Sequence, residues 1–197
     1  MPFIPINSKR ILDIGCGGGN FAVAVQKRNN AEVWGVEPDE EACKIAESKL
    51  RKVLCGTIER VESILPTSFF DVIIFNDVLE HMVNPQTALG IAKNALIDNG
   101  IIVVSLPNVR YFQTIVELLY RKDWQYQDSG ILDRTHLRFY TEKSARRMFE
   151  EEGFTLLSVD GINPIKNPWF KVFNLISLGY IRDMKFLQHV FVLSIKR

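Results

Sequence analysis

An apolar segment that runs directly into a glycine-rich turn constrains this chain more than any other feature. Residues 11–19 read Ile-Leu-Asp-Ile-Gly-Cys-Gly-Gly-Gly. A short apolar run is typical of a buried parallel strand, and glycines after it allow backbone amides to approach a ligand closely. Residues 20–28 are expected to begin a helix at the turn, and a helix N-terminus favours a bound anionic group. The segment therefore predicts a nucleotide-cofactor turn between a strand and a helix.

The spacing of the glycines leaves two registers open. The dinucleotide fingerprint is Gly-x-Gly-x-x-Gly, and counted from Gly15 its third glycine position falls on Asn20. A shifted register of Gly17, Gly19 and Ala22 satisfies the looser form that ends in alanine, but it leaves two extra residues between strand and turn. The glycines alone therefore discriminate weakly between cofactors.

An acidic residue at the end of the next strand supports adenosine binding. Residues 31–37 read as a second strand that ends on Glu37. A ribose-binding carboxylate belongs about 20 positions after the glycine turn, and one carboxylate can accept hydrogen bonds from both ribose hydroxyls. The alternative is an acid that caps the following helix through the helix dipole. The position favours the ribose role without identifying the rest of the cofactor.

Strand and helix signals alternate along the first two thirds of the chain, which predicts a parallel sheet with crossover helices. The expected strands are residues 10–14, 31–37, 53–55, 70–75 and 101–106, and the expected helices are residues 20–28, 39–51 and 87–97, with Asn99-Gly100 ending the last of them. The alternation then breaks. Later elements are expected at 109–122 (helix), 141–153 (helix capped by Thr141), 154–160 (strand), 161–188 (apolar residues at helical spacing) and 189–195 (strand).

In the register that starts at the strand end, Asp13-x-Gly15-x-Gly17-x-Gly19, the turn resembles motif I of the class I S-adenosylmethionine-dependent methyltransferases. The resemblance is strong over residues 10–106. It implies an α/β, doubly wound, seven-stranded and mostly parallel sheet (the Rossmann-like methyltransferase fold) with an antiparallel last strand beside the fifth. It also implies S-adenosyl-L-methionine as cofactor, with S-adenosyl-L-homocysteine as product, and contacts between the turn, including Cys16, and the methionine part of the cofactor.

The same resemblance assigns further cofactor-binding residues. Glu37 matches the ribose acid, and Pro38 occupies a position that flanks the adenosine. The segment 55–59 matches the stretch near adenine, where Ile58 would supply the apolar contact and either Thr57 or Glu59 the polar one.

Residues 76–81, Asn-Asp-Val-Leu-Glu-His, resemble the Glu-His motif of small-molecule methyltransferases in this class. They follow a central strand at its carboxyl end, where doubly wound folds bind ligands. Asn76 and Asp77 are therefore expected at the cofactor. His81 is a candidate for catalysis, although a structural role is equally consistent with its position.

Residues 132–141 resemble a stretch found in methyltransferases of bacterial cell-surface glycan pathways. This segment holds Asp133 and His136 in a non-repetitive stretch, and loops carry function disproportionately. The alternative is a solvated connection whose charges pair with one another. For a hydroxyl acceptor a general base would help, and histidine is best suited at neutral pH. His136, with Asp133 nearby, is the preferred base, whereas His189 begins an apolar strand and is expected to be structural.

The remaining expectations concern domains and partners. The chain is expected to form a single domain over residues 1–197, in which the insertions 107–140 and 161–188 make an acceptor-site lid. A net charge of +1 points to neither nucleic acid nor an anionic membrane. No apolar run reaches transmembrane length. Peripheral docking through the apolar stripe at 169–181 is a less favoured possibility, because few basic residues accompany it.

The cysteines Cys16, Cys43 and Cys55 lack disulfide or metal-site spacing, so free thiols in a reducing cytoplasm are expected. No metal is expected either, since no two histidines stand at ligand spacing in the sequence.

The sequence thus predicts an S-adenosylmethionine-dependent O-methyltransferase acting on a small molecule or glycan precursor, with a sugar or quinone-like acceptor. An NAD-dependent oxidoreductase or epimerase remains an alternative through the shifted glycine register, although no Tyr-x-x-x-Lys pair supports it. A non-catalytic protein that binds the same cofactor is the other alternative.

Overall fold

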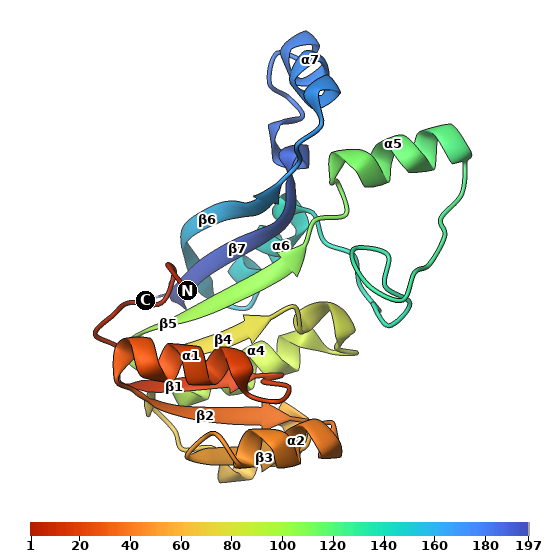
Figure 1. Ribbon diagram of the computed structural model, residues 1–197. Coiled ribbons are helices and arrows are strands. Elements are labelled where there is room, and N and C mark those ends of the chain that lie inside the picture. Colours follow the sequence, from red (N-terminus) through yellow and green to blue (C-terminus); the bar gives the residue numbers. More distant parts are fainter. Residues whose placement is uncertain (197) are drawn as a thin grey trace.

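A single twisted sheet organises the molecule (Figure 1). The computed structural model describes residues 1–196, and within them seven strands pair in the order β3-β2-β1-β4-β5-β7-β6. The strands are β1 (Arg10–Ile14), β2 (Glu32–Glu37), β3 (Lys52–Cys55), β4 (Phe70–Asn76), β5 (Leu96–Pro107), β6 (Phe154–Pro164) and β7 (Phe186–Ile195). The first five pair in parallel, and β7 lies antiparallel between β5 and β6. The predicted fold class is confirmed, including the antiparallel last strand.

Helices cover both faces of the sheet. They are α1 (Asn20–Asn29), α2 (Glu40–Glu47), α3 (Ile58–Val61), α4 (Pro85–Ala95), α5 (Phe112–Arg121), α6 (Glu142–Glu151) and α7 (Pro168–Ile176), with short 3-10 turns η1 (Glu62–Ile64), η2 (Leu79–His81) and η3 (Arg182–Lys185). Apolar side chains of α3, α4 and α6 form one core with one face of the strands, and those of α1 and α2 form a second core with the other face. Alternate residues of each strand enter the two cores, as expected for a sheet buried on both sides.

Local signals explain where several helices begin. The Asp39 side chain accepts a hydrogen bond from the backbone amide of Ala42 at the start of α2. Thr141 and Ser144 form a reciprocal capping box at the start of α6, as the threonine predicted. These caps satisfy amides that have no partner inside the helix, and they place each helix directly after the loop that precedes it.

Two predicted boundaries in the N-terminal half are wrong. The helix expected at 87–97 is α4 and ends at Ala95, and β5 begins at Leu96 instead of after Asn99-Gly100. Leu96 pairs with Phe70 ahead of an irregularity in the ladder, so strand pairing extends β5 through the Asn-Gly pair. The helix expected at 39–51 ends at Glu47, and Leu50 folds back from the following turn into the core.

The C-terminal half departs further from the sequence pattern. The strands β6 and β7 are longer than expected because they pair with each other out to Pro164 and Phe186. Only Pro168–Ile176 of the expected helical stretch 161–188 forms an α-helix. Helix α5 starts at Phe112 rather than at residue 109, because the Asn108 side chain accepts from the Arg110 amide and holds that segment in a turn. Within the described residues, no helix is long and apolar enough to cross a bilayer.

Candidate functional site

The glycine turn joins β1 to α1 at the carboxyl edge of the sheet, in the backbone conformation that glycines allow. Gly15, Gly17 and Gly19 all have positive φ, at 69°, 52° and 76°. The amides of Gly15 and Cys16 donate to the carbonyl of Val36, at 2.8 and 3.2 Å, which ties the turn to β2. A Cβ at Gly15 would lie 2.6 Å from Cγ2 of Val78, so this position has no space for a side chain. The predicted turn is therefore built as a close-approach backbone surface.

Glu37 lies at the end of β2, directly against this turn. One carboxylate oxygen accepts from the amide of Gly17 at 2.6 Å, and the other accepts from the amide of Asp39 at 3.0 Å. The side chain is buried, and the amide of Gly56 donates to the Glu37 carbonyl at 2.8 Å. A carboxylate has further lone pairs, so Glu37 can still accept hydrogen bonds from a diol.

Asp13 near the end of β1 and Cys16 within the turn are both buried. Burial, and secondly the nearby Glu37 carboxylate, raises the pKa of Asp13 to about 7. Burial, followed by the charges of Asp13 and Glu37, raises the pKa of the Cys16 thiol to about 12, so the thiol stays protonated and unreactive. The Cys16 sulfur packs against Gly35, where a Cβ would lie 2.5 Å from it. Both residues support the turn from below.

A pocket of about 560 Å³ opens in front of the turn. Its walls come from the ends of β1, β2 and β3 and from the segment after β4: Ile14, Gly15, Val36, Glu37, Pro38, Gly56, Thr57, Ile58, Glu59, Asp77, Val78, His81, Met82, Val83 and Asn84. The predicted cofactor residues Gly15, Glu37, Pro38, Thr57, Ile58 and Asp77 are all in this lining. The predicted Asp13, Cys16, Gly17, Gly19 and Asn76 are outside it, in the turn behind the wall or at the end of β4.

Asp77 stands where this pocket meets a second one. Its backbone has a φ of 53°, uncommon for a residue other than glycine. One carboxylate oxygen accepts from the hydroxyl of Ser105 at 2.9 Å, and the other accepts from the side-chain amide of Gln188 at 2.7 Å. Asp77 thereby joins β4, β5 and β7 at one point of the sheet edge.

The second pocket, of about 290 Å³, adjoins the first and holds every predicted catalytic residue. It is lined by Asp77, Glu80, His81, Pro107, Gly130, Ile131, Asp133, His136, Leu187 and Gln188. Asp77 and His81 line both pockets. The structure therefore brings His81 from η2 together with Asp133 and His136 from the segment 132–141, more than fifty positions later in the chain.

The two histidines lie in contact, with ring centroids 4.7 Å apart. Nδ1 of His136 lies 3.0 Å from the carbonyl of Ile131, and because a carbonyl only accepts, this nitrogen carries the proton. Nε2 of neutral His136 is thus left as an acceptor. The Asp133 carboxylate does not bond to His136 but accepts from the Thr135 hydroxyl at 2.7 Å, and that hydroxyl lies 3.1 Å from Nδ1 of His81. Asp133 therefore orients His81 through Thr135.

Glu80 is the functional candidate that sequence reasoning left out of the site. It is buried and neither of its carboxylate oxygens has a hydrogen-bond partner among the described residues. Burial is the main cause that raises its pKa to about 8. Its backbone carbonyl accepts from the amides of Leu137 and Arg138, at 2.9 and 3.1 Å, which fastens the segment 132–141 onto η2. The Glu-His pair after a central strand was the available signal.

Ligand atoms of Glu80, His81 and His136 all lie within 4.8 Å of one another, so these three side chains could hold a metal ion. The sequence argument against a metal considered only spacing along the chain, which does not reveal that His81 and His136 meet in space.

The third histidine, His189, is buried in β7, and burial lowers its pKa. Its Nδ1 lies 3.9 Å from the Glu142 carboxylate. It lies outside both pockets, in line with its predicted structural role.

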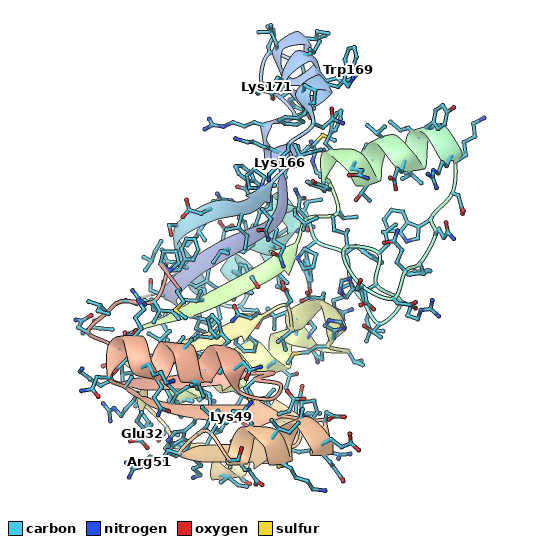
Figure 2. The ribbon with its side chains drawn as sticks, viewed as in Figure 1. Glu32, Lys49, Arg51, Lys166, Trp169 and Lys171 are labelled. Atoms are coloured by element: carbon cyan, nitrogen blue, oxygen red, sulfur yellow. A yellow bond between two sulfur atoms is a disulfide. The ribbon has the colours of Figure 1, made fainter. Side chains whose placement is uncertain are left out.

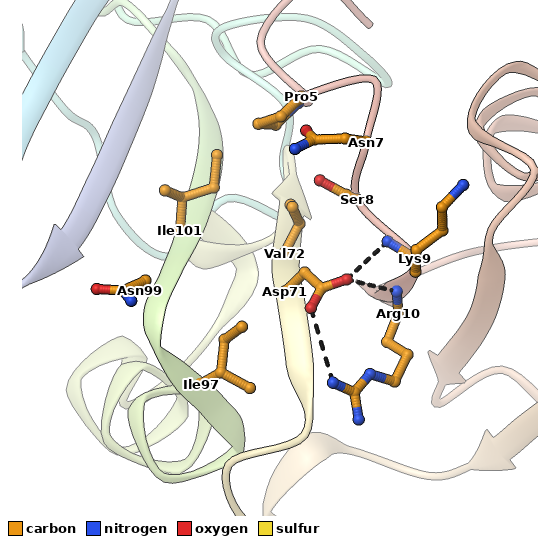
Figure 3. A pocket seen from close by; sticks show the side chains of 10 residues that line it. All are labelled: Pro5, Asn7, Ser8, Lys9, Arg10, Asp71, Val72, Ile97, Asn99 and Ile101. Carbon is orange, nitrogen blue, oxygen red and sulfur yellow. Dashed lines mark hydrogen bonds and ion pairs between the residues drawn. The ribbon is translucent and has the colours of Figure 1, made fainter.

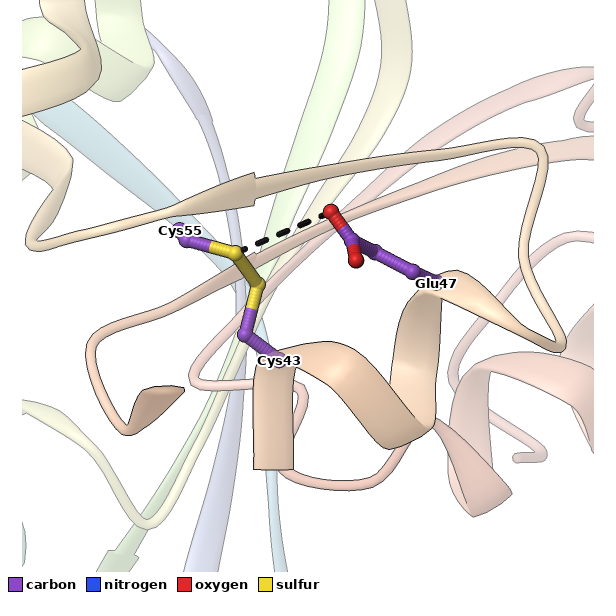
Figure 4. Close-up of side chains that lie close together, drawn as sticks. All are labelled: Cys43, Glu47 and Cys55. Atoms are coloured by element: carbon purple, nitrogen blue, oxygen red, sulfur yellow. Dashed lines mark hydrogen bonds between the residues drawn. A yellow bond between two sulfur atoms is a disulfide. The ribbon is translucent and has the colours of Figure 1, made fainter. Parts of the chain in front are cut away.

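A disulfide next to the first pocket corrects the prediction of free thiols. Cys43 of α2 and Cys55 of β3 are bonded, with Cα atoms 5.7 Å apart, and Glu47 lies beside them (Figure 4). Packing of α2 against the end of β3 brings the two together, which spacing along the chain did not predict. Cys16 is the remaining thiol and is buried. The bond closes the loop of residues 43–55, which ends directly before the pocket wall at Gly56.

A further hollow of about 510 Å³ lies at the opposite edge of the sheet, where β1 and β4 begin (Figure 3). There Asp71 accepts from the amides of Lys9 and Arg10, at 2.6 and 2.9 Å, and lies 3.9 Å from the Arg10 guanidinium. These contacts fasten the chain ahead of β1, and this hollow is remote from the glycine turn.

Comparisons with known proteins agree with this geometry. Residues 2–159 match the protein family described as "Methyltransferase domain". The chain is 24% identical over 183 residues to the mitochondrial ubiquinone biosynthesis O-methyltransferase of Bos taurus, covering 85% of this chain and 48% of that protein. It is 30% identical over 174 residues to the ubiquinone biosynthesis O-methyltransferase of Psychrobacter arcticus, covering 82% and 66%. The chain thus spans about half the length of the mitochondrial relatives it matches.

Solved structures show the same fold. A SAM-dependent methyltransferase from Archaeoglobus fulgidus superimposes with a TM-score of 0.68 at 19% identity, covering 94% of this chain and 85% of that chain. The [4+2]-cyclase SpnF superimposes with a TM-score of 0.64 at 16% identity, covering 96% and 76%. Because a cyclase shares it, the fold by itself does not determine the reaction.

Proposed function

This chain belongs to the family of S-adenosylmethionine-dependent methyltransferases, and on that premise we propose that it methylates a hydroxyl oxygen of a small-molecule or glycan-type acceptor. The observation that carries the proposal is the junction of two pockets at Asp77 and His81. One pocket carries the features expected for the cofactor, and the other carries histidines that can accept a proton. Relatives that are ubiquinone biosynthesis O-methyltransferases support a hydroxyl acceptor.

The residues of the first pocket fit the cofactor. S-Adenosylmethionine supplies a sulfonium-bound methyl group that is transferred by in-line displacement. Glu37 would bind the ribose hydroxyls, and Pro38, Thr57 and Ile58 would flank the adenine. Gly15 lines this pocket, and its backbone would contact the methionine part. These residues mainly align the reacting groups in a site from which water is excluded.

His136 would act as the general base. Its Nδ1–H is held by the Ile131 carbonyl, so Nε2 is available to accept the proton of the acceptor hydroxyl as the oxygen is methylated. Thr135 and Asp133 hold His81 beside it, and His81 would position the acceptor between the two pockets. The segments 107–140 and 161–188 would form the walls of the acceptor site.

Replacement of His136 tests this proposal. His136→Asn should lower kcat by about 100-fold or more, because general-base contributions are of that order. The affinity for S-adenosylhomocysteine, measured by calorimetry, should stay unchanged. His189→Asn, a buried histidine outside the pockets, is the matched control and should keep its kcat. The assay follows S-adenosylhomocysteine release with a panel of phenols, quinols and nucleotide sugars.

Two controls separate the alternatives. The assay is run with and without EDTA, so that a contribution from a cation at Glu80, His81 and His136 is distinguished from proton transfer. Binding of NAD in place of S-adenosylhomocysteine would contradict the cofactor assignment. Binding of S-adenosylhomocysteine without methyl transfer to any acceptor, and without an effect of His136→Asn, would instead support a non-catalytic cofactor-binding protein.

A further inference from the structure

The segment between β6 and β7, residues 165–185, projects from the body of the molecule, and we name it the arm (Figure 1). It consists of α7, a turn and η3. The amide of Ile165 donates to the carbonyl of Lys185 at 2.7 Å, which closes its base. The arm leaves the sheet at the edge where β5 ends, since Pro107 of β5 pairs with Gln188 of β7.

The arm exposes an unusual number of large apolar side chains. Leu178 is 95% exposed, Tyr180 82% and Leu175 77%. The other exposed apolar residues of the arm are Trp169, Val172, Phe173 and Ile176. The surfaces of monomeric soluble proteins rarely expose so many apolar side chains in one place, and such patches mark sites of contact with a membrane or another protein. The spacing of the exposed apolar residues on α7 places them on one broad face of the helix, opposite the buried Phe170, as in helices that lie flat in a membrane interface.

The arm carries charge of one sign as far as residue 182. Residues 161–182 contain no Asp or Glu, and they carry Lys166, Lys171 and Arg182. Figure 2 shows Lys171 and Trp169 on α7, and Lys166 below them near the base of the arm. The first acid after this stretch, Asp183, is already paired with Arg110 at 2.6 Å. Exposed apolar residues accompanied only by free basic side chains are typical of segments that lie in the interface of an anionic bilayer.

The arm is attached to the body by specific contacts. Phe170 and Met184 pack with Phe112 of α5 in a small apolar cluster. The side-chain amide of Asn108 donates to the carbonyls of Asp183 and Phe186, at 2.9 and 3.0 Å. The orientation of the tip relative to the acceptor pocket is therefore fixed by α5 and by the base of the arm.

We propose that the arm docks on an anionic lipid bilayer, with the tip of α7 and its turn inserted at headgroup depth. Trp169 and Tyr180 have the amphipathic rings that favour this depth, and Lys166 and Lys171 face the anionic headgroups. The acceptor pocket, lined by Leu187 and Gln188 just beyond the base of the arm, then stands close to the membrane surface. Docking goes beyond the proposed function and does not depend on it.

Cosedimentation with vesicles tests the proposal. The chain should bind vesicles of phosphatidylcholine mixed with phosphatidylglycerol at least about tenfold better than vesicles of phosphatidylcholine alone, and added salt should reduce this preference. The double variant Lys166→Glu, Lys171→Glu should lose about tenfold or more of the anionic binding. The double variant Leu175→Glu, Leu178→Glu should abolish binding to both kinds of vesicle.

Matched controls lie elsewhere on the surface. Lys27→Glu changes an exposed lysine on α1, and Ile64→Glu changes an exposed apolar residue of η1, so both should bind like the wild type. Circular dichroism and thermal melting confirm that each variant is folded. Brominated lipids should quench the fluorescence of Trp169, and Trp169→Phe should leave the signal of Trp34 and Trp124 unquenched.

Three outcomes would overturn the proposal. Wild-type protein that stays in the supernatant with anionic vesicles shows that the arm does not dock. A control variant that loses as much binding as the arm variants shows that the arm is not the docking element. A dimer in sedimentation velocity that Leu175→Glu, Leu178→Glu dissolves, in the absence of vesicle binding, would assign the arm to contact with a second copy of the chain.

Discussion

The half of the molecule around the first pocket, which we propose as the cofactor pocket, and the half around the second, which we propose as the acceptor pocket, are held together by different kinds of contact. Around the glycine turn, the contacts join residues of neighbouring elements, such as Gly17 with Glu37, 20 positions apart. Around the acceptor pocket they join distant segments, such as Asp77 with Gln188, 111 positions apart. Local patterns of strand, turn and helix therefore encode the first half, whereas the second depends on pairings that no local pattern contains.

The two halves also differ in the size of the core beneath them. Phe75 of β4 is fully buried in the large cluster below the sheet, between β1 and β5. Phe170 of α7 is buried in a cluster with only Phe112 and Met184 as buried partners. Because local stability follows the density of buried apolar contacts, we expect the arm to open at a lower free energy than the sheet.

A pair of Phe→Ala variants tests this difference and should give the largest effect. Phe75→Ala should lower the global free energy of unfolding by about 3–5 kcal/mol, measured by denaturant titration. Phe170→Ala should instead remove hydrogen-exchange protection from the arm and leave that of the sheet unchanged. If Phe75→Ala does not fold, Phe75→Leu gives the same comparison on a smaller scale. Equal global destabilisation by both alanine variants would show that the arm and the sheet form one cooperative unit.

A pair of glycine variants separates the two pockets. In Gly15→Ala the new Cβ would lie 2.6 Å from Val78 at a φ of 69°, so binding of S-adenosylhomocysteine should weaken by about 100-fold, or ~3 kcal/mol. Gly130 also has a positive φ, of 89°, but nothing lies within 4 Å of its Cβ position. Gly130→Ala should therefore cost only about 1–2 kcal/mol of strain and leave the affinity unchanged. Calorimetry measures both, and a Gly130→Ala variant that binds as poorly as Gly15→Ala would refute the separation.

The disulfide belongs to the cofactor half alone. Cys43→Ser should lower the free energy of unfolding by about 2–3 kcal/mol, because a bond that closes a short loop restricts the unfolded chain by that amount. Dithiothreitol should lower the stability of the wild type toward that of the variant and should not affect the variant. Cys16→Ser, which removes the buried thiol, is the control: its stability should still fall on reduction. Wild-type protein whose stability is the same with and without reductant would contradict the bond.

Two carboxyls should change how stability depends on pH, with opposite signs. The pKa of Asp13 is raised to about 7, so the folded state keeps a proton that the unfolded chain loses near pH 4. Stability should therefore fall as pH rises from about 4 to 7, and Asp13→Asn should flatten this slope.

The pKa of Asp133 is lowered by the hydrogen bonds that its carboxylate accepts from Thr135, so the stability that Asp133 contributes is lost as pH falls below about 4. Asp133→Asn should change the pH dependence of stability only in this acidic range. Urea titrations at a series of pH values measure the free energy of unfolding of each variant. If that free energy changes with pH equally in Asp13→Asn and in the wild type, the prediction for Asp13 is contradicted.

The same contrast explains how far the sequence could predict the molecule. The order of the strands and longer helices to residue 106, the glycine turn and the position of Glu37 follow from short-range periodicity and turn chemistry. The structure has them in the expected order, with the short α3 and η1 as elements that were not predicted. The predicted end of α4 was wrong, because the pairing of Leu96 with Phe70 starts β5 before the chain reaches the helix-stop signal at Asn99-Gly100.

On the acceptor side, the sequence identified the chemical groups without their arrangement. His81, Asp133 and His136 do line one pocket. Asp133, however, reaches His81 through Thr135 rather than His136, and the unpaired Glu80 carboxylate beside the histidines was not predicted. Cys43 and Cys55 likewise meet only because α2 packs on β3. Each of these depends on tertiary contacts, which periodicity does not report.

The antiparallel insertion of β7 has a consequence for how the chain folds. β7 fills the space between β5 and β6, and ribosomes produce it after both of these neighbours. Until it arrives, β5 and β6 present open strand edges, which are prone to pair with other chains. Its pairing with β5 also joins residues far apart in sequence, and such contacts form slowly. We therefore expect the closure of the sheet by β7 to be the slow phase of refolding and the stage at which chaperones protect this chain from aggregation.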